Sequence, residues 1–256
     1  MEVAIGLGLL LAAGVAAWRT ARGRLRQHHL MRLCHRAGLR FLPAGAEEAA
    51  WLPFRWAVSG RWLRAENLVW DPRDPEVRAF DLLVEDAHRP SEPSAGPVGV
   101  RRRSCAVAAV AASCPRLLVR SERFADAIAR PLLGDEIDLD LEAFNRRFRV
   151  WSEDRGFAIA FCDQRMMRAM LALPSRTAVA ACEDRILLFG PELSPGGVVS
   201  LLEAARALRD AVPGVLGSLF PPRPERSPYE GRWLQGHWSR EPIGSGEPDA
   251  SAPETG

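Results

Sequence analysis

Two aspartates, Asp138 and Asp140, stand in a stretch where apolar and acidic residues alternate. In an extended strand, side chains two residues apart point to the same face. Two carboxylates on one face can bridge a divalent cation, as the paired aspartates of nucleotide-sugar transferases do. No phosphate-binding glycine loop or positioned base accompanies this pair, and nearby arginines offer ordinary ion-pair partners. The sequence therefore favours a solvated or arginine-paired acidic face over a metal site, with these arginines as partners: Arg146, Arg147 and Arg149.

The cysteines are the next candidate reactive groups, and no two of them form a Cys-x-x-Cys pair: Cys34, Cys105, Cys114, Cys162 and Cys182. An odd number without paired spacing indicates reduced, buried thiols in a cytoplasmic domain rather than a disulfide framework. Cys162 is a candidate nucleophile, but no histidine stands near it in the sequence, so a buried structural role is favoured. Three histidines near Cys34 lack a neighbouring carboxylate, which favours solvated or packed side chains over a metal site: His28, His29 and His35.

Catalytic motifs are absent from the sequence, which contains no Gly-x-Ser-x-Gly, no His-Glu-x-x-His and no Walker loop. No catalytic residue is assigned, no cofactor is predicted, and a non-enzymatic role is favoured. The alternative is a membrane-tethered enzyme that uses Asp138 and Asp140 with a divalent metal. The net charge of +2 does not imply a nucleic-acid partner, and every basic residue is an arginine, so each basic feature must be discounted.

The sequence patterns along the rest of the chain predict an α+β fold. It consists of an antiparallel sheet with two amphipathic helices, preceded by one N-terminal transmembrane helix. Residues 57–72 and 76–86 predict two strands separated by a Pro-rich turn, and residues 101–113 and 115–122 predict two more short strands. These strands in the first half of the chain predict an antiparallel meander. Residues 136–142 extend the sheet with the acidic face. A hairpin that turns at Glu183 and Asp184 is predicted within residues 177–191.

Two amphipathic helices complete the predicted domain. Residues 157–171 carry an apolar stripe that ends near Pro174. Residues 194–216 predict the second helix, with Ser194 as its cap and Pro195 in its first turn. The apolar stripe of this second helix is Val198, Leu201, Leu202, Ala205 and Leu208.

The amino-terminal residues 3–18 contain no charged side chain. As a helix, this run would be about 24 Å long, slightly short of a hydrocarbon core of about 30 Å, and flanking residues can extend it. Glu2 stands where a signal peptide would have a basic start, and the arginines follow the apolar run. The positive-inside rule then places the amino terminus outside and the rest of the chain in the cytoplasm. We therefore predict an uncleaved single-pass anchor that includes Val3, Leu9, Leu10, Leu11 and Trp18.

Four arginines directly after this run are predicted to face lipid: Arg19, Arg22, Arg24 and Arg26. The segment from residue 19 to residue 40 predicts an amphipathic helix that continues from the anchor. It serves either as a lipid-docking surface or only as a topology signal, and the second is favoured. Small residues recur every four positions in the apolar run, at Ala4, Gly8, Ala12 and Ala16. This spacing predicts a homodimer through the transmembrane helix, with chance spacing in an alanine-rich chain as the favoured alternative.

The stretch "LEAFNRRFRVWSEDRGFAIAFCDQRMM", together with "AENLV", "AFDLLV" and "CPRLLVRSE", resembles a family of uncharacterised membrane-anchored proteins from high-GC actinobacteria. The resemblance covers roughly residues 30 to 212 and implies an amino-terminal apolar helix, a Phe-Asp strand and a Phe-Asn-Arg element followed by an Arg-Met-Met helix. Phe80 and Asp81 match the strand motif, while Leu82 stands where a tyrosine is more usual. The resemblance implies no activity.

These features predict four parts: a transmembrane anchor (1–20), a basic juxtamembrane helix or linker (21–44), an α+β globular domain (45–220) and a largely disordered Pro/Gly-rich tail (221–256). Trp233 and Trp238 in the tail form either a short docking motif or a segment that packs onto the domain. The predicted protein is a binding or scaffolding module at the inner membrane face. Its predicted partners are the membrane, another protein or a second copy, and not nucleic acid.

Overall fold

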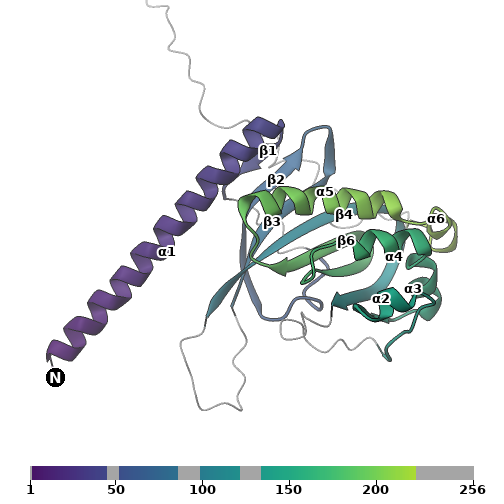
Figure 1. Ribbon diagram of the computed structural model, residues 1–256, viewed down its shortest axis with the longest axis horizontal. Coiled ribbons are helices and arrows are strands. Elements are labelled where there is room, and N and C mark those ends of the chain that lie inside the picture. The colour runs from purple at the N-terminus through teal and green to yellow at the C-terminus, as the bar shows by residue number, and fades with distance from the viewer. Residues whose placement is uncertain (1, 45–51, 86–98, 122–133, 223–256) are drawn as a thin grey trace, which may run out of the picture.

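The computed structural model describes residues 2–44, 52–85, 99–121 and 134–222. Within the first range, the side chains of residues 2–13, 15, 16 and 19 lie outside the description. Figure 1 shows a twisted sheet with helices packed on one face, and one long helix that projects beyond the sheet. The predicted α+β class with an antiparallel sheet is confirmed.

Helix α1 (Glu2–Ala37) is continuous and ends at Gly38, whose φ of +68° suits the glycine that commonly terminates a helix. Its carboxy-terminal half packs against the body, and its amino-terminal half projects away from it (Figure 1). The buried side chains recur every four residues, at Arg26, Leu30 and Cys34. This spacing places them on one face of the helix. Part of the segment predicted as a juxtamembrane helix or linker therefore belongs to the core.

Among the residues that the structure describes with their side chains, no helix is long and apolar enough to span a bilayer. Four of the predicted anchor residues lie outside those described side chains: Val3, Leu9, Leu10 and Leu11. Trp18, the last residue of the apolar run, is described and is 60% exposed.

The described residues form a six-stranded antiparallel sheet: β1 (Arg40–Leu42), β2 (Arg61–Asp71), β3 (Asp74–Glu85), β4 (Val100–Ser121), β5 (Phe148–Ser152) and β6 (Ala178–Pro191). Strands β1 to β4 pair in chain order, which confirms the predicted meander. β4 is the central strand, because β3 pairs with its first part, β5 with its last part and β6 with both.

Two strand predictions were wrong for the same reason. Residues 100–121 form one strand rather than two, and residues 178–191 form one strand rather than a hairpin. The register between β4 and β6 shifts between Ala109 and Cys114 and again before Leu117, and Pro115 lies within the second shift. Glu183, the predicted turn residue, lies opposite Cys114 with a φ of +55°. A bulge absorbs such irregular residues without ending the strand.

The acidic segment also differs from its prediction. Residues 136–140 belong to no strand, and they lead into the short helix α2 (Glu142–Asn145). The side chain of Asn145 accepts a hydrogen bond from the Leu139 N–H and donates one to its carbonyl. The Ile137 N–H donates to the Val150 carbonyl at 2.8 Å. These bonds fix the segment beside β5 and α2 without a continuous strand pairing.

The predicted helix at 157–171 is two helices, α3 (Arg155–Phe161) and α4 (Gln164–Leu171). The break occurs because Asp163 caps the second helix through the Met166 N–H, as Asp154 caps the first. Helix α5 (Pro195–Ala211) has the predicted Ser194 cap and buries the predicted stripe. The short helix α6 (Val215–Leu219) follows.

Alternation along the strands gives the sheet two apolar faces. On β3, Val77 and Ala79 face the large core beneath α1, α4 and α5, whereas Phe80 and Leu82 face the second cluster, which includes Phe54. Helix α5 crosses the first face (Figure 1). Asp81 has the same parity as Val77 and Ala79, so its carboxylate points to the helical face.

Candidate functional site

The carboxylate of Asp81 lies beneath α1 and is completely buried. It accepts two hydrogen bonds from Arg26, at 2.7 Å from Nε and 2.8 Å from Nη2. It also accepts from Asn67 Nδ2 at 2.7 Å and from Ser104 Oγ at 3.1 Å. A buried carboxylate is stable only when its charge is paired and its oxygens are hydrogen-bonded, and both conditions hold here.

The same cluster continues into the connection between β6 and α5. Arg26 Nη1 donates to the Leu193 carbonyl at 2.5 Å, and the Leu193 N–H donates to Ser104 Oγ at 3.0 Å. Asn67 adopts a φ of +57°, a left-handed conformation that asparagine tolerates better than most residues. One buried network therefore ties α1 to β2, β3, β4 and the start of α5. We call Arg26, Asn67, Asp81 and Ser104 the buried cluster.

The position of Arg26 differs from its predicted lipid-facing role. Its side chain is 7% exposed and bonds to Asp81 instead of solvent. Arg22 and Arg24, one turn or less before it, are exposed. The side chain of Arg19 lies outside the description. The basic surface of α1 is therefore narrower than the sequence suggested, because one arginine fixes the helix to the sheet.

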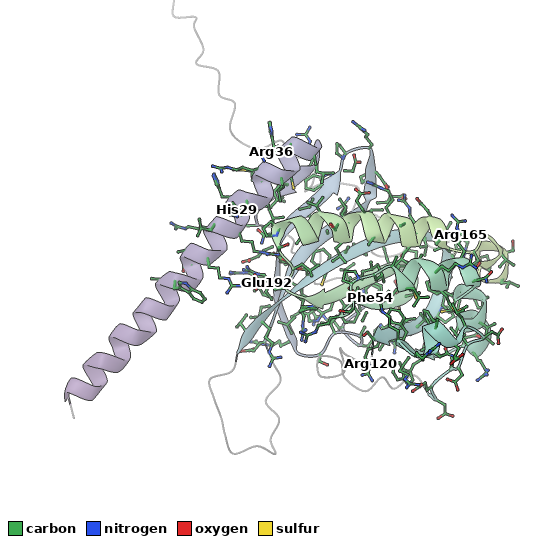
Figure 2. The ribbon with its side chains drawn as sticks, viewed as in Figure 1. His29, Arg36, Phe54, Arg120, Arg165 and Glu192 are labelled. Atoms are coloured by element: carbon green, nitrogen blue, oxygen red, sulfur yellow. The ribbon has the colours of Figure 1, made fainter. Side chains whose placement is uncertain are left out.

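A groove of about 650 Å³ opens beside the buried cluster, where α1 leaves the sheet. One wall is α1 from Trp18 to Gln27, and the other comes from β2, β3, β4 and Glu192. Figure 2 shows Glu192 at the place where α1 passes the sheet. We call this feature the α1 groove. Its charged and apolar lining residues are Trp18, Arg22, Arg24, Arg64, Glu66, Leu83, Val100, Arg102 and Glu192.

Ion pairs organise the walls of the α1 groove. Glu66 pairs with Arg64 at 2.6 Å and with Arg102 at 3.2 Å. Glu192 also pairs with Arg102, at 3.6 Å, and it lies 3.8 Å from Arg22. Four arginines face two glutamates in the lining, so the groove has an excess of two positive charges. It is chemically suited to an anion that also presents apolar surface to Trp18.

The paired aspartates of the metal alternative, Asp138 and Asp140, are both exposed. The neighbouring arginines have other partners: Arg149 pairs with Glu136, Arg146 pairs with Glu142, and Arg147 donates to the carbonyls that end α4. Within the described ranges, no group of three or more His, Cys, Asp or Glu side chains is arranged to hold a metal ion.

All five cysteines are buried and free. Burial raises the pKa of the Cys162 thiol to about 12, so it is protonated at neutral pH and lacks the thiolate that a nucleophile needs. Burial likewise raises the pKa of Cys34 to about 11. His28, His29 and His35 are exposed, whereas Cys34 faces the core. Trp233 and Trp238 lie outside the described residues.

Several residues of the buried cluster and of the α1 groove could not be identified from the sequence: Arg64, Glu66, Asn67, Arg102, Ser104 and Glu192. They come from two strands, β2 and β4, and from the loop after β6, and no local spacing connects them. Two signals were present in the sequence. The first is Asp81, a charged residue within an apolar strand. The second is Arg26, which lies on the same helical face as the buried residues Leu30 and Cys34.

The fold is similar to that of a solved structure. This is the crystal structure of the mycobacterial trehalose monomycolate transport factor A, TtfA. The two superpose with a TM-score of 0.51 at 15% sequence identity, over 79% of this chain and 98% of that one. The mycobacterial source is consistent with the actinobacterial resemblance. No protein-family model matches the chain, and no curated protein matches it in sequence.

Proposed function

We propose that this protein is a membrane-tethered cytoplasmic module that binds or scaffolds other components at the inner membrane face and assists lipid transport. The observation that carries the proposal is the buried cluster. It holds α1 rigidly against the sheet through Arg26 and Asp81, just beyond the apolar run of the same helix. A helix that only needed to tether a domain could end in a flexible linker. A continuous, fixed helix sets the height and orientation of the body at the bilayer.

The shared fold supports the lipid-transport part of the proposal. The protein of known structure is named as a transport factor for trehalose monomycolate, and we extend a role of this type to the present chain. The features of this chain that agree with a binding role are the α1 groove and the cysteine burial, which disfavours thiol catalysis.

The first experiment determines topology. An epitope tag is placed after Gly256, intact spheroplasts are treated with protease, and the tag is detected before and after lysis. We expect protection until lysis, because the arginines that follow the apolar run retain the body in the cytoplasm. A periplasmic protein that is digested in the same sample serves as the control. Loss of the tag from intact spheroplasts would refute the cytoplasmic location.

The second experiment tests the anchor itself. Leu9→Arg combined with Leu11→Arg should release the protein from the membrane fraction, since an arginine at the centre of a membrane helix costs about 2.5–3.5 kcal/mol. The matched control is Leu25→Arg with Met31→Arg, two exposed positions on the same helix. The control should stay in the membrane fraction. Equal retention of both variants would show that the apolar run is not the anchor.

A further inference from the structure

We infer that the α1 groove binds the headgroup of one anionic phospholipid from the cytoplasmic leaflet of the membrane. The inference rests on the proposed membrane attachment and adds a ligand to it. It differs from attraction of the exposed arginines on α1 to a charged surface, because half of the groove's cationic residues, Arg64 and Arg102, come from the sheet.

Charge gives the first argument. The two glutamates in the lining are engaged by arginines, so they are neutralised without using all the donors. Each guanidinium has five N–H groups, and its planar fork matches two oxygens of a phosphate. Arg64 is 69% exposed and Arg24 is exposed, so both can reach a bound anion.

The apolar lining gives the second argument. Trp18, Leu83 and Val100 line the same cavity as the arginines, and Trp18 and Val100 are exposed despite their size. Inorganic phosphate would leave this surface in water. The glycerol and upper acyl region of a phospholipid would cover it. Tryptophan is also enriched at the depth of the headgroups in membrane proteins.

Position along the helix gives the third argument. Trp18 closes the apolar run, and Arg22 follows it by one turn, about 6 Å along the axis. If the apolar run lies in the hydrocarbon core, the α1 groove opens at the depth of the headgroups. A lipid of the cytoplasmic leaflet could then enter the α1 groove sideways without leaving the bilayer. This geometry selects the membrane over solution as the source of the ligand.

The test measures lipid binding to the full-length chain in a nonionic detergent by native mass spectrometry. The probes are dioleoyl phosphatidylglycerol and dioleoyl phosphatidylcholine, which have the same acyl chains. We expect one retained phosphatidylglycerol and much weaker binding of phosphatidylcholine. Arg24→Gln with Arg64→Gln should weaken phosphatidylglycerol binding roughly tenfold, since each arginine near an anionic lipid contributes a several-fold attraction. Both side chains are exposed, and the unfolding temperature checks that the fold is kept.

Two further variants separate the groove from general charge. Arg32→Gln with Arg36→Gln removes the same charge from exposed positions of α1 outside the groove and should bind like the parent chain. Val100→Trp fills the groove without changing the charge and should weaken binding as strongly as the arginine pair. Binding that is insensitive to Val100→Trp, equal loss in both arginine pairs, or equal binding of the two lipids would each overturn the inference. Because this readout is made in detergent, it is independent of the protease topology that tests the proposed function.

Discussion

Two arginine–aspartate clusters hold helices against the β2–β3 hairpin, and they differ in their access to water. In the buried cluster, Asp81 is completely buried and Arg26 is 7% exposed. At the hairpin turn, Arg206 and Arg209 of α5 pair with Asp74, at 2.9 and 2.6 Å, with all three side chains 20–24% exposed. The distances between the charged atoms are similar in the two clusters, but the charged groups of the first cluster are much less accessible to water than those of the second. Removing one partner from the first cluster leaves a buried charge with fewer partners and no access to water, whereas water can replace the missing partner in the second cluster.

The difference assigns separate structural roles to the two clusters. The buried cluster admits one arrangement, because every oxygen of Asp81 is used by a donor from α1, β2 or β4. It therefore determines the direction in which α1 leaves the body. We call Asp74, Arg206 and Arg209 the outer cluster. It tolerates rearrangement, since Arg206 also pairs with Glu203 and Asp71. It adds stability to α5, whose position is already set by its buried apolar stripe.

The largest effect is expected from Asp81→Asn, which removes the hydrogen-bonded counter-charge of the buried Arg26 and leaves only Glu192, at 3.7 Å, as a carboxylate partner. We expect a loss of about 3–5 kcal/mol in the free energy of unfolding, measured by urea denaturation. The double variant Arg26→Met with Asp81→Leu should recover much of this loss, because it removes both charges together. A loss below about 1 kcal/mol for Asp81→Asn would show that the pair is not desolvated.

The same variant should release α1 locally, and Cys34 reports this directly. Burial raises its pKa to about 11, so its thiol in the parent protein should resist alkylation at pH 8. In Asp81→Asn, peptide mapping by mass spectrometry should show faster alkylation of Cys34 than of Cys162, which lies after α3. Equal rates at the two cysteines would indicate global unfolding in place of local release.

A smaller effect is expected from Asn67→Ala, which removes one donor to Asp81 and places alanine at a φ of +57°. We expect a loss of about 2–3 kcal/mol, measured by urea denaturation. Asn67→Gly is the control, because glycine keeps the backbone conformation and loses only the hydrogen bond. If the two variants are equally stable, backbone strain makes no contribution at this residue.

In the outer cluster, Asp74→Asn should cost about 1–2 kcal/mol at pH 7. The hydrogen bond from Arg209 lowers the pKa of Asp74 in the folded state. A lowered pKa stabilises the fold above the unfolded-state value of about 3.9, and this contribution is lost as the pH falls through the folded-state pKa. The stability difference between the variant and the parent should therefore shrink below about pH 4 and vanish in stronger acid. A difference that persists in strong acid would attribute the effect to packing instead of charge.

The smallest effect is expected at the rim of the outer cluster. Glu203→Gln alters a partner of Arg206 that is 55% exposed, and thermal unfolding should show a change within about 0.5 kcal/mol. A loss as large as that of Asp74→Asn would mean that the outer cluster acts as a tightly coupled network, and the contrast between the two clusters would weaken.

Sequence patterns correctly predicted the helices and strands that are stabilised mainly by residues close to each other in the sequence. The α5 helix was predictable with its cap and stripe, because capping at Ser194 and helical periodicity depend on residues near in sequence. The strands β2 and β3 followed from apolar runs separated by a turn. The predictions failed where pairing decides the structure. Pro115 and Glu183 are turn residues by local preference, but two long strands pair across both positions and absorb them as irregular register.

The sequence by itself determined the α+β class, the antiparallel meander and the α5 helix. Tertiary structure alone decided which arginine of α1 turns inward and which residues surround the α1 groove. An arginine at position 22, 24 or 26 has the same local preference, and only the carboxylate of Asp81 beneath the helix distinguishes Arg26. Burial of a charge depends on a partner 55 residues away, and no periodicity of a single segment encodes such a partner.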